Sequence, residues 1–192
     1  MDVLLICKWM WLAWILVWMI WAAQSKKTQE QESFGSIISY GVFAWTGMYV
    51  ALYRNSLGAW GRNTVLPPSA WMGWCAVVLV ALGFAITFWA RAILGNNWSG
   101  TVAVKVEHEL IRTGPYRWVR HPIYSGLILA IIGTLIAFDQ WRGFVALPLL
   151  WAAFTIKRLK EEQFMRQTFG DQYVEYSRTT GAIFPLFLRR SS

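Results

Sequence analysis

The chain has 192 residues, of which 56% are hydrophobic, 17% are aromatic and 14 are tryptophan. Charged residues make up 15%, against roughly 25% in soluble globular domains, and they gather between long apolar runs. This composition excludes a disordered chain, a disulfide-stabilised secreted domain and a conventional soluble enzyme. It is typical of a protein that crosses a membrane several times. We therefore interpret the net charge of +8 as a sign of topology and anionic lipid, and we expect no nucleic acid as a partner.

Three apolar runs fill the N-terminal half of the chain. The first, Val3–Ala23, is long enough to cross a hydrocarbon core of about 30 Å at about 1.5 Å per residue. The second is Ile37–Tyr53, and the third, Trp71–Leu94, ends at a Gly-Asn-Asn turn signal. We assign residues 1–94 to three transmembrane helices.

Two further apolar runs follow, Pro122–Phe138 and Gly143–Ile156, and only four residues separate them. They must form an antiparallel hairpin. The second run is short for a span, so we expect it to continue out of the lipid into the charged segment 157–162. The predicted fold is all-α, with five transmembrane helices, and residues 95–192 form a second region made of a connector, a transmembrane hairpin and a C-terminal tail.

The lysines and arginines indicate how these spans are oriented. Five spans place the chain ends on opposite sides of the membrane, and one side collects fourteen basic residues while the other has four. The side that is rich in basic residues faces the cytoplasm. We therefore expect a multi-pass protein of the cell inner membrane, with its N-terminus outside and its C-terminus, the 95–121 connector and any chemistry on the cytoplasmic side.

Ionisable residues cluster at the start of the fourth span and just after the fifth. Pro122 suits the first position of a helix, which makes His121 the residue before it and leaves backbone amides exposed. A helix start beside Arg120 can bind a carboxylate or a phosphate. Glu161 and Glu162 are costly at an interface unless they face a cavity or a cation. A ligand that carries both an anion and a cation would suit this arrangement.

The same residues also fit structural roles. His121 could cap a helix, Arg120 could bind lipid headgroups, and Glu161 with Glu162 could form a solvated helix face. The motifs HExxH, CxxC, the Walker loop and GxSxG are absent from the sequence, which leaves metal, nucleotide and serine hydrolase chemistry without support. We predict no metal site.

The order of the motifs resembles the isoprenylcysteine carboxyl methyltransferase family, including its prokaryotic members, and the related phospholipid methyltransferases. The resemblance covers roughly residues 90–186. RHPxYxG followed by a glutamate pair is a fairly specific signature, whereas RHP alone would be weak. The segments that carry it are Leu94-Gly95-Asn96-Asn97-Trp98-Ser99, His108-Glu109-Leu110-Ile111-Arg112-Thr113-Gly114-Pro115-Tyr116, Arg120-His121-Pro122-Ile123-Tyr124-Ser125-Gly126, Glu161-Glu162 and Phe169-Gly170-Asp171-Gln172-Tyr173.

This resemblance implies an integral-membrane methyltransferase that binds S-adenosylmethionine without a Rossmann domain, and it makes residues 95–192 the catalytic region. The partners it implies are the lipid bilayer and a hydrophobic or prenyl-like methyl acceptor. It assigns cofactor binding to His108, Glu109, Leu110, Ile111, Tyr116, His121, Pro122, Ile123, Tyr124 and Glu161. It assigns catalysis to Arg158, Glu162 and Arg120. The helix start would suit the cofactor carboxylate and a glutamate its ammonium.

One position departs from the family pattern. When the chain is aligned on Phe169-Gly170, the family's arginine falls at Lys157, and Arg158 lies one residue later. Spacing pairs Lys157 with Glu161 and Arg158 with Glu162. Because lysine lacks the bidentate fork of arginine, either the acceptor differs from prenylcysteine or Arg158 takes the role.

Two other functions stay open at this stage. A membrane reductase of the sterol-reductase kind has a related RHPxYxG stretch and uses NADPH, although such enzymes have more spans. A non-catalytic helical protein whose basic tail binds anionic lipid is the other. The acceptor is also open, because prenylated cysteine, phosphatidylethanolamine and small thiols all fit a lipid-like or small hydrophobic acceptor.

Overall fold

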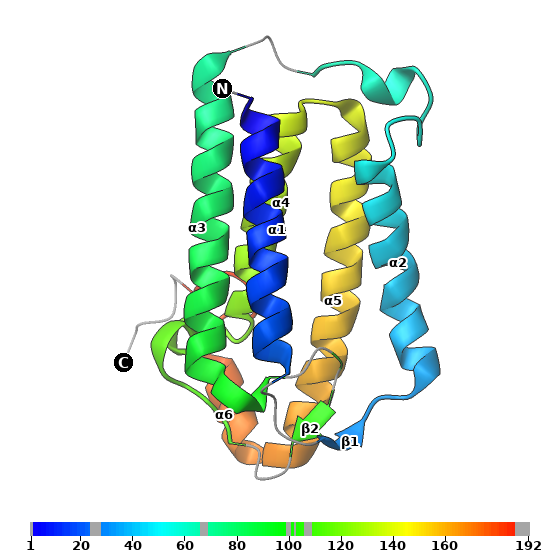
Figure 1. Cartoon of the computed structure of the whole chain (residues 1–192). Helices are drawn as coiled ribbons and strands as arrows, with labels where there is room; N and C mark the ends of the chain where they lie inside the picture. The colour runs from blue at the N-terminus through cyan, green and yellow to red at the C-terminus, as the bar shows by residue number, and fades with distance from the viewer. Residues whose placement is uncertain are drawn as a thin grey trace.

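A computed structural model describes residues 2–23, 28–65, 69–98, 101, 103–105 and 109–186. Within these residues the chain forms six α-helices and one two-stranded antiparallel sheet (Figure 1). The helices are α1 Val3–Ala22, α2 Phe34–Leu52, α3 Ala70–Leu94, α4 Pro122–Phe138, α5 Trp141–Phe169 and α6 Asp171–Thr179. The strands are β1 Thr28–Gln31 and β2 Ala103–Lys105, and three short 3₁₀ helices cover Trp60–Arg62, Gly95–Asn97 and Gly114–Arg117.

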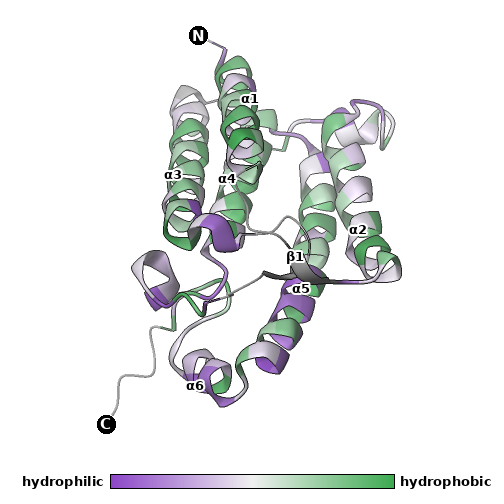
Figure 2. Ribbon diagram, turned by 60° about the horizontal axis from the view of Figure 1, so that its bottom comes forward, coloured by the Kyte–Doolittle hydropathy of each residue, from purple (hydrophilic) through white to green (hydrophobic). Residues whose placement is uncertain are grey.

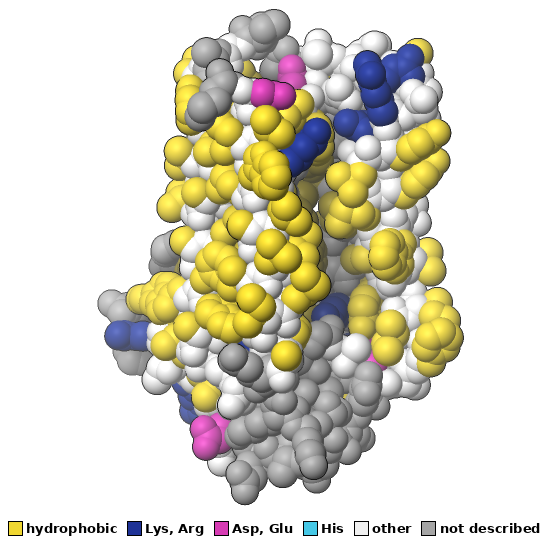
Figure 3. Space-filling view, in the orientation of Figure 1, with side chains coloured by type: hydrophobic (Ala, Val, Ile, Leu, Met, Phe, Trp, Pro, Cys, Tyr) yellow, Lys and Arg dark blue, Asp and Glu magenta, His cyan; other side chains and the backbone are white. Residues whose placement is uncertain are grey.

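Helices α1, α2 and α3 are long and apolar enough to cross a membrane. Helix α4 is a shorter apolar helix, and α5 changes from apolar to charged along its length. Figure 2 shows this change along α5. Helices α1, α3 and α4 are largely hydrophobic, whereas α6 and the end of α5 next to it are hydrophilic. Apolar side chains also cover much of the face drawn in Figure 3. The structure therefore has the multi-pass, helical arrangement that the sequence predicts.

The helices pack as two groups. Helix α3 lies along α4 with α1 against both, whereas α2 lies along α5. Glycines bring α3 and α4 together, since a Cβ built on Gly83 would lie 2.5 Å from the Gly126 carbonyl oxygen and 2.6 Å from the Ala130 nitrogen. This close approach is typical of small-residue helix packing in membranes. It holds the start of α4 in a fixed position relative to the end of α3.

The elements that the site uses gather at one end of the bundle. The ends of α1, α3 and α5, the start of α4, and α6 with the small sheet all lie there (Figure 1). Helix α5 ends at Phe169, and the next residue, Gly170, has a φ of 52° that turns the chain into α6. The tail then runs beside the start of α4, because the Arg120 and His121 amides donate to the carbonyls of Gly181 and Ala182 at 2.8 and 2.9 Å.

Candidate active site

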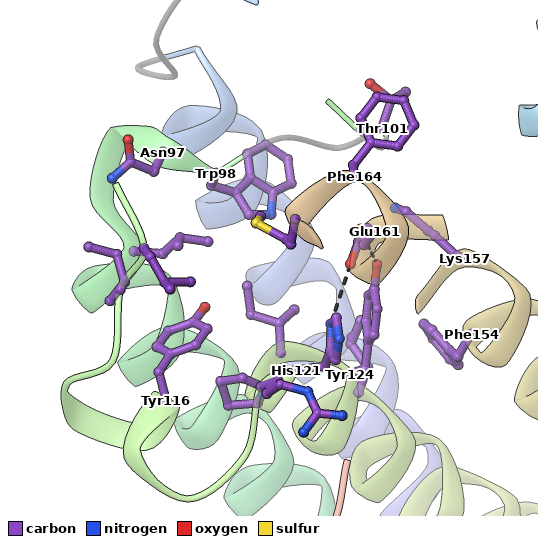
Figure 4. A pocket seen from close by; sticks show the side chains of 18 of the residues that line it. Asn97, Trp98, Thr101, Tyr116, His121, Tyr124, Phe154, Lys157, Glu161 and Phe164 are labelled. Carbon is purple, nitrogen blue, oxygen red and sulfur yellow. Dashed lines mark hydrogen bonds and ion pairs between the residues drawn. The ribbon is translucent and has the colours of Figure 1, made fainter. Parts of the chain in front are cut away.

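A cavity of about 450 Å³ opens at this end of the bundle (Figure 4). Its walls come from α1, described residues between 94 and 116, the start of α4, the charged half of α5, and α6. Small-molecule sites in proteins usually measure roughly 300–1,000 Å³. The cavity therefore has the size of a cofactor or substrate site.

The start of α4 and the charged half of α5 build the polar wall. The His121 ring lies between two carboxylates, with Nδ1 3.4 Å from Glu161 Oε2 and Nε2 3.3 Å from Glu162 Oε1. The Tyr124 hydroxyl donates to Glu161 Oε1 at 2.6 Å, and the Tyr124 and His121 rings stack with centroids 5.5 Å apart. Although His121 precedes the helix as predicted, its side chain makes no capping hydrogen bond to the described residues. His121 is thus the N-cap residue of α4, as predicted, but its ring lies between the two glutamates instead of bonding the backbone amides of the helix.

The charges in this wall reinforce one another. Burial lowers the pKa of the His121 imidazole, but hydrogen bonds and charges from Glu161 and Glu162 outweigh it and raise that pKa above its usual value. Burial raises the pKa of each carboxyl, and His121 again reverses the effect, lowering the pKa of Glu161 and, with Arg120 and Arg158, the pKa of Glu162 to about 2. These directions favour an imidazolium between two carboxylates.

The two neighbouring glutamates face different surroundings. Glu161 lines the cavity, whereas Glu162 is 4% exposed and lies in an ion cluster beside it. Glu162 is 3.2 Å from Arg120, 3.0 Å from Arg158 and 3.8 Å from Arg166. Glu161 is therefore the carboxylate that a ligand can reach.

Arg120 connects this ion cluster to the tail. Its guanidinium also donates to the Ser177 carbonyl at 3.0 Å and to the Thr180 carbonyl. These bonds engage the side chain that the sequence assigned to an anion. Arg120 reaches the cavity wall, but it chiefly fastens α5 and the tail to the start of α4.

Lys157 was not among the predicted site residues, yet it lines the cavity. Its ammonium lies 5.6 Å from the Tyr40 ring of α2 and 5.9 Å from the Tyr124 ring. Figure 4 shows Lys157 and Glu161 on the same side of α5. The four-residue spacing of Lys157 and Glu161 was the signal available in the sequence. Arg158, by contrast, turns to Glu162.

An aromatic wall faces the cavity from α1, and the sequence did not identify it as part of the site. Trp14 and Trp18 line the cavity together with Trp98. The first two rings stack with centroids 4.5 Å apart, and Trp98 meets Trp18 edge-on at 5.5 Å. In the sequence these tryptophans look like others that face lipid, because nothing in a single apolar helix marks which face a distant loop will cover.

The structure brings most of the predicted site residues together. His108 lies outside the described residues. Arg120 lines the cavity, whereas Arg158 and Glu162 face the ion cluster and do not line it. The predicted cofactor residues that line the cavity are Glu109, Leu110, Ile111, Tyr116, His121, Pro122, Ile123, Tyr124 and Glu161.

The polar wall of the cavity lies in a segment that matches a known protein family. The model of the isoprenylcysteine carboxyl methyltransferase (ICMT) family matches residues 76–167. A probable protein-S-isoprenylcysteine O-methyltransferase of Oryza sativa subsp. indica is 32% identical over 117 residues, which are 59% of this chain and 61% of that protein. The protein-S-isoprenylcysteine O-methyltransferase of Saccharomyces cerevisiae is 32% identical over 111 residues, 56% of this chain and 46% of the yeast protein.

A bacterial relative and a solved structure extend the comparison. The uncharacterised protein YpbQ of Bacillus subtilis is 38% identical over 66 residues, 34% of this chain and 38% of that protein. The chain thus covers 38–61% of the length of these relatives, less than two thirds of each. A structure of the eukaryotic intramembrane Ras methyltransferase ICMT superposes with a TM-score of 0.52 at 21% identity, over 81% of this chain and 54% of that chain. The two chains share a fold.

Proposed function

We propose that this chain is an integral-membrane member of the isoprenylcysteine carboxyl methyltransferase family, whose model matches residues 76–167, and that it takes its methyl group from S-adenosylmethionine. The observation that carries the proposal is the position of Glu161, His121 and Tyr124. All three lie in the matched segment and form the polar wall of one cavity.

The residues of the cavity fit the chemical parts of S-adenosylmethionine. Glu161 offers a carboxylate to the ammonium group, and the amides at the start of α4, including that of Ile123, suit the carboxylate. Tyr116, Leu110 and the other apolar side chains of the wall suit the adenine and the sulfonium face. The volume of about 450 Å³ accommodates a ligand of that class. When bound, S-adenosylmethionine would supply an electrophilic methyl group, and transfer of that group to the acceptor would convert the sulfonium into a neutral thioether.

The polar wall is better suited to aligning an acceptor than to deprotonating it. Both ring nitrogens of His121 face carboxylates, and the raised imidazole pKa disfavours a free nitrogen that could take a proton. The Tyr124 hydroxyl already donates to Glu161. An acceptor that is nucleophilic at neutral pH, such as a carboxylate, therefore fits this site better than an ammonium that must first lose a proton. Because Lys157 stands where the family has an arginine, we assign binding of the acceptor carboxylate to the ammonium group of Lys157.

Arg120, Arg158 and Glu162 position the site in this proposal. Their ion cluster holds α5, the tail and the start of α4 in one arrangement. Glu162 also holds the His121 ring from the side away from Glu161. Fixing these groups before the ligand binds reduces the cost of aligning donor and acceptor.

We further propose that all five helices α1–α5 cross the membrane, with the cavity on the cytoplasmic side. A five-span assignment of the sequence puts fourteen of the 18 lysines and arginines on the side of the 95–121 connector, the side that the positive-inside rule assigns to the cytoplasm. A furrow runs down the molecule between the part that contains α1 and the part formed by α2 and α5 (Figure 3). This furrow supports a hydrophobic acceptor that reaches the cavity from the bilayer.

Isothermal titration of the purified full chain with S-adenosylhomocysteine tests the proposal. We expect micromolar binding by the wild type, and at least tenfold weaker binding by Glu161→Gln. NADPH serves as the competing ligand, because a reductase would bind it instead. Binding of NADPH without S-adenosylhomocysteine, or of neither ligand, contradicts the proposal.

A further inference from the structure

A polar cluster joins the start of α2 to the charged half of α5, which lie along one another (Figure 1). Glu32, just before α2, is 7% exposed, and its carboxylate accepts hydrogen bonds from the Ser36 hydroxyl at 2.5 Å and the Tyr40 hydroxyl at 2.7 Å. From α5, the Lys160 ammonium donates to the Ser36 hydroxyl at 2.7 Å and to its carbonyl at 3.2 Å. A buried carboxylate is costly unless such bonds satisfy it. The cluster therefore fixes the Tyr40 side chain beside α5.

The ring of Tyr40 is one of two that flank the Lys157 ammonium. The Tyr40 ring of α2 and the Tyr124 ring of α4 have their centroids 5.6 and 5.9 Å from the Lys157 nitrogen. These distances are in the range of cation–π attraction. Each tyrosine hydroxyl donates to a carboxylate, Tyr40 to Glu32 and Tyr124 to Glu161. Neither ring can turn away from the ammonium without losing a hydrogen bond.

The flexibility of a lysine side chain makes this arrangement matter for the reaction. An ammonium is a point charge on a four-carbon stem that carries about 2 kcal/mol of rotamer entropy, and it lacks the rigid fork of an arginine. Neighbouring groups that restrict the stem before a ligand binds reduce the cost of binding. Lys157 lines the cavity, whereas Tyr40 is not among the described residues that line it. Tyr40 can therefore act on a ligand only through Lys157.

We propose that Tyr40 is a positioning residue that holds the Lys157 ammonium where it binds the carboxylate of the methyl acceptor. This inference rests on the proposed methyltransferase function, in which Lys157 binds that carboxylate. It gives α2, which lies outside the family-matched segment 76–167, a part in acceptor recognition.

The test compares two ligands that differ only in the group that Lys157 would bind: N-acetyl-S-farnesylcysteine and its carboxamide. Binding of each to the full chain in lipid nanodiscs is measured by calorimetry with S-adenosylhomocysteine present. We expect the wild type to favour the acid, and Tyr40→Leu to bind the acid about fivefold more weakly while its affinity for the carboxamide is unchanged. In methyl transfer, the acceptor KM should rise by the same factor with kcat within about twofold of the wild type.

Tyr40→Phe separates the ring from the hydroxyl. Both Tyr40→Phe and Tyr40→Leu lose the hydrogen bond to Glu32, but only the phenylalanine keeps an aromatic face toward the ammonium. We expect Tyr40→Phe to stay within about twofold of the wild type for the acid. If Tyr40→Leu does not fold, as judged by S-adenosylhomocysteine binding, Tyr40→Met takes its place with the same expected result.

A double mutant and a surface control complete the test. If Tyr40 acts through Lys157, adding Tyr40→Leu to Lys157→Ala should weaken acid binding no further. Tyr49→Leu is the matched control, because Tyr49 lies on the same helix, nine residues or about half a turn round from Tyr40, and is 55% exposed. We expect it to bind the acid as the wild type does, and all these variants to keep the wild-type affinity for S-adenosylhomocysteine.

Several outcomes would overturn the role of Tyr40. They are an equal loss for acid and carboxamide, a further loss of acid binding in the Lys157→Ala background, a Tyr40→Phe variant as weak as Tyr40→Leu, and a wild type that does not prefer the acid. A wild type that prefers the acid in a manner that depends on Tyr40, but transfers no methyl group, would instead refute the methyltransferase function and leave the positioning of Lys157 standing.

Discussion

Replacing each of the two adjacent glutamates by glutamine separates a ligand-binding carboxylate from a structural one. Glu161 faces the cavity, and Glu162 faces the ion cluster. The substitution is the same in both variants and changes size very little. A difference between them therefore reports the surroundings of the two side chains.

We expect Glu162→Gln to destabilise the protein. Its carboxylate is 4% exposed, and Arg120 and Arg158 beside it are largely buried, so both cations would lose their partner. Breaking a buried ion pair costs about 3–5 kcal/mol, and a hydrogen bond to a charged group contributes about 1.5–3 kcal/mol. Because the arginines retain some solvent and backbone partners, we expect a loss of about 2–3 kcal/mol, which lowers the melting temperature by about 5–10 °C.

We expect Glu161→Gln to leave the fold largely intact. The glutamine oxygen can still accept the hydrogen bond from Tyr124, and Glu162 remains beside the His121 ring to balance its charge. The free energy of unfolding should change by less than about 1 kcal/mol. S-adenosylhomocysteine binding should weaken by at least about tenfold, since the ammonium loses a charged partner.

Thermal unfolding in detergent and calorimetric titration, applied to both variants, give the answer. The expected result is a crossed pattern in which Glu162→Gln lowers the melting temperature and Glu161→Gln lowers the affinity. A destabilised Glu161→Gln that binds normally, or a stable Glu162→Gln, would refute the division of roles between the two carboxylates.

Three further predictions follow from the packing and the charges. Gly83→Val should lower the free energy of unfolding by about 1–3 kcal/mol, because the added side chain meets the Gly126 backbone. Gly41→Ala is the control and should leave that free energy unchanged, because no atom lies within 4 Å of the added Cβ. Equal melting temperatures for the two variants would contradict this prediction. The stability that His121 adds over His121→Gln should be present below about pH 6.5 and lost as the pH rises through the raised folded pKa; a melting-temperature difference that grows with pH would oppose this. Lys157→Ala should raise the acceptor KM about tenfold without changing S-adenosylhomocysteine affinity, and Lys157→Arg should largely restore it; a loss of cofactor affinity instead would argue against an acceptor role.

Long apolar runs bounded by strong end signals made most of the fold predictable. The fourth span was expected at Pro122–Phe138, which are the bounds of α4, because proline fixes the helix start. The fifth run was expected to continue into the charged segment, and α5 does so as far as Phe169. The sheet was not foreseen, since β1 and β2 have four and three residues and pair across more than 70 positions of sequence.

The candidate site was predictable where residues lie close in sequence. The RHPxY stretch and the glutamate pair identified the polar wall, but a sequence of two adjacent glutamates cannot say which one faces a cavity. That choice depends on how α5 is rotated against α4, and the helix places Glu161 with Lys157 on one face and Glu162 with Arg158 on another. The contribution of α1 was missed because it arises from the packing of helices whose partners are distant in the chain.

Transfer of a radiolabelled methyl group from S-adenosylmethionine to N-acetyl-S-farnesylcysteine by the purified chain in lipid nanodiscs tests the central claim most directly. The account predicts a labelled product that releases methanol in alkali, as a carboxyl methyl ester does. It also predicts that Glu161→Gln loses most of this activity at a limiting cofactor concentration. A wild-type chain that binds S-adenosylhomocysteine but forms no alkali-labile product, or a Glu161→Gln variant with full activity, would contradict the account.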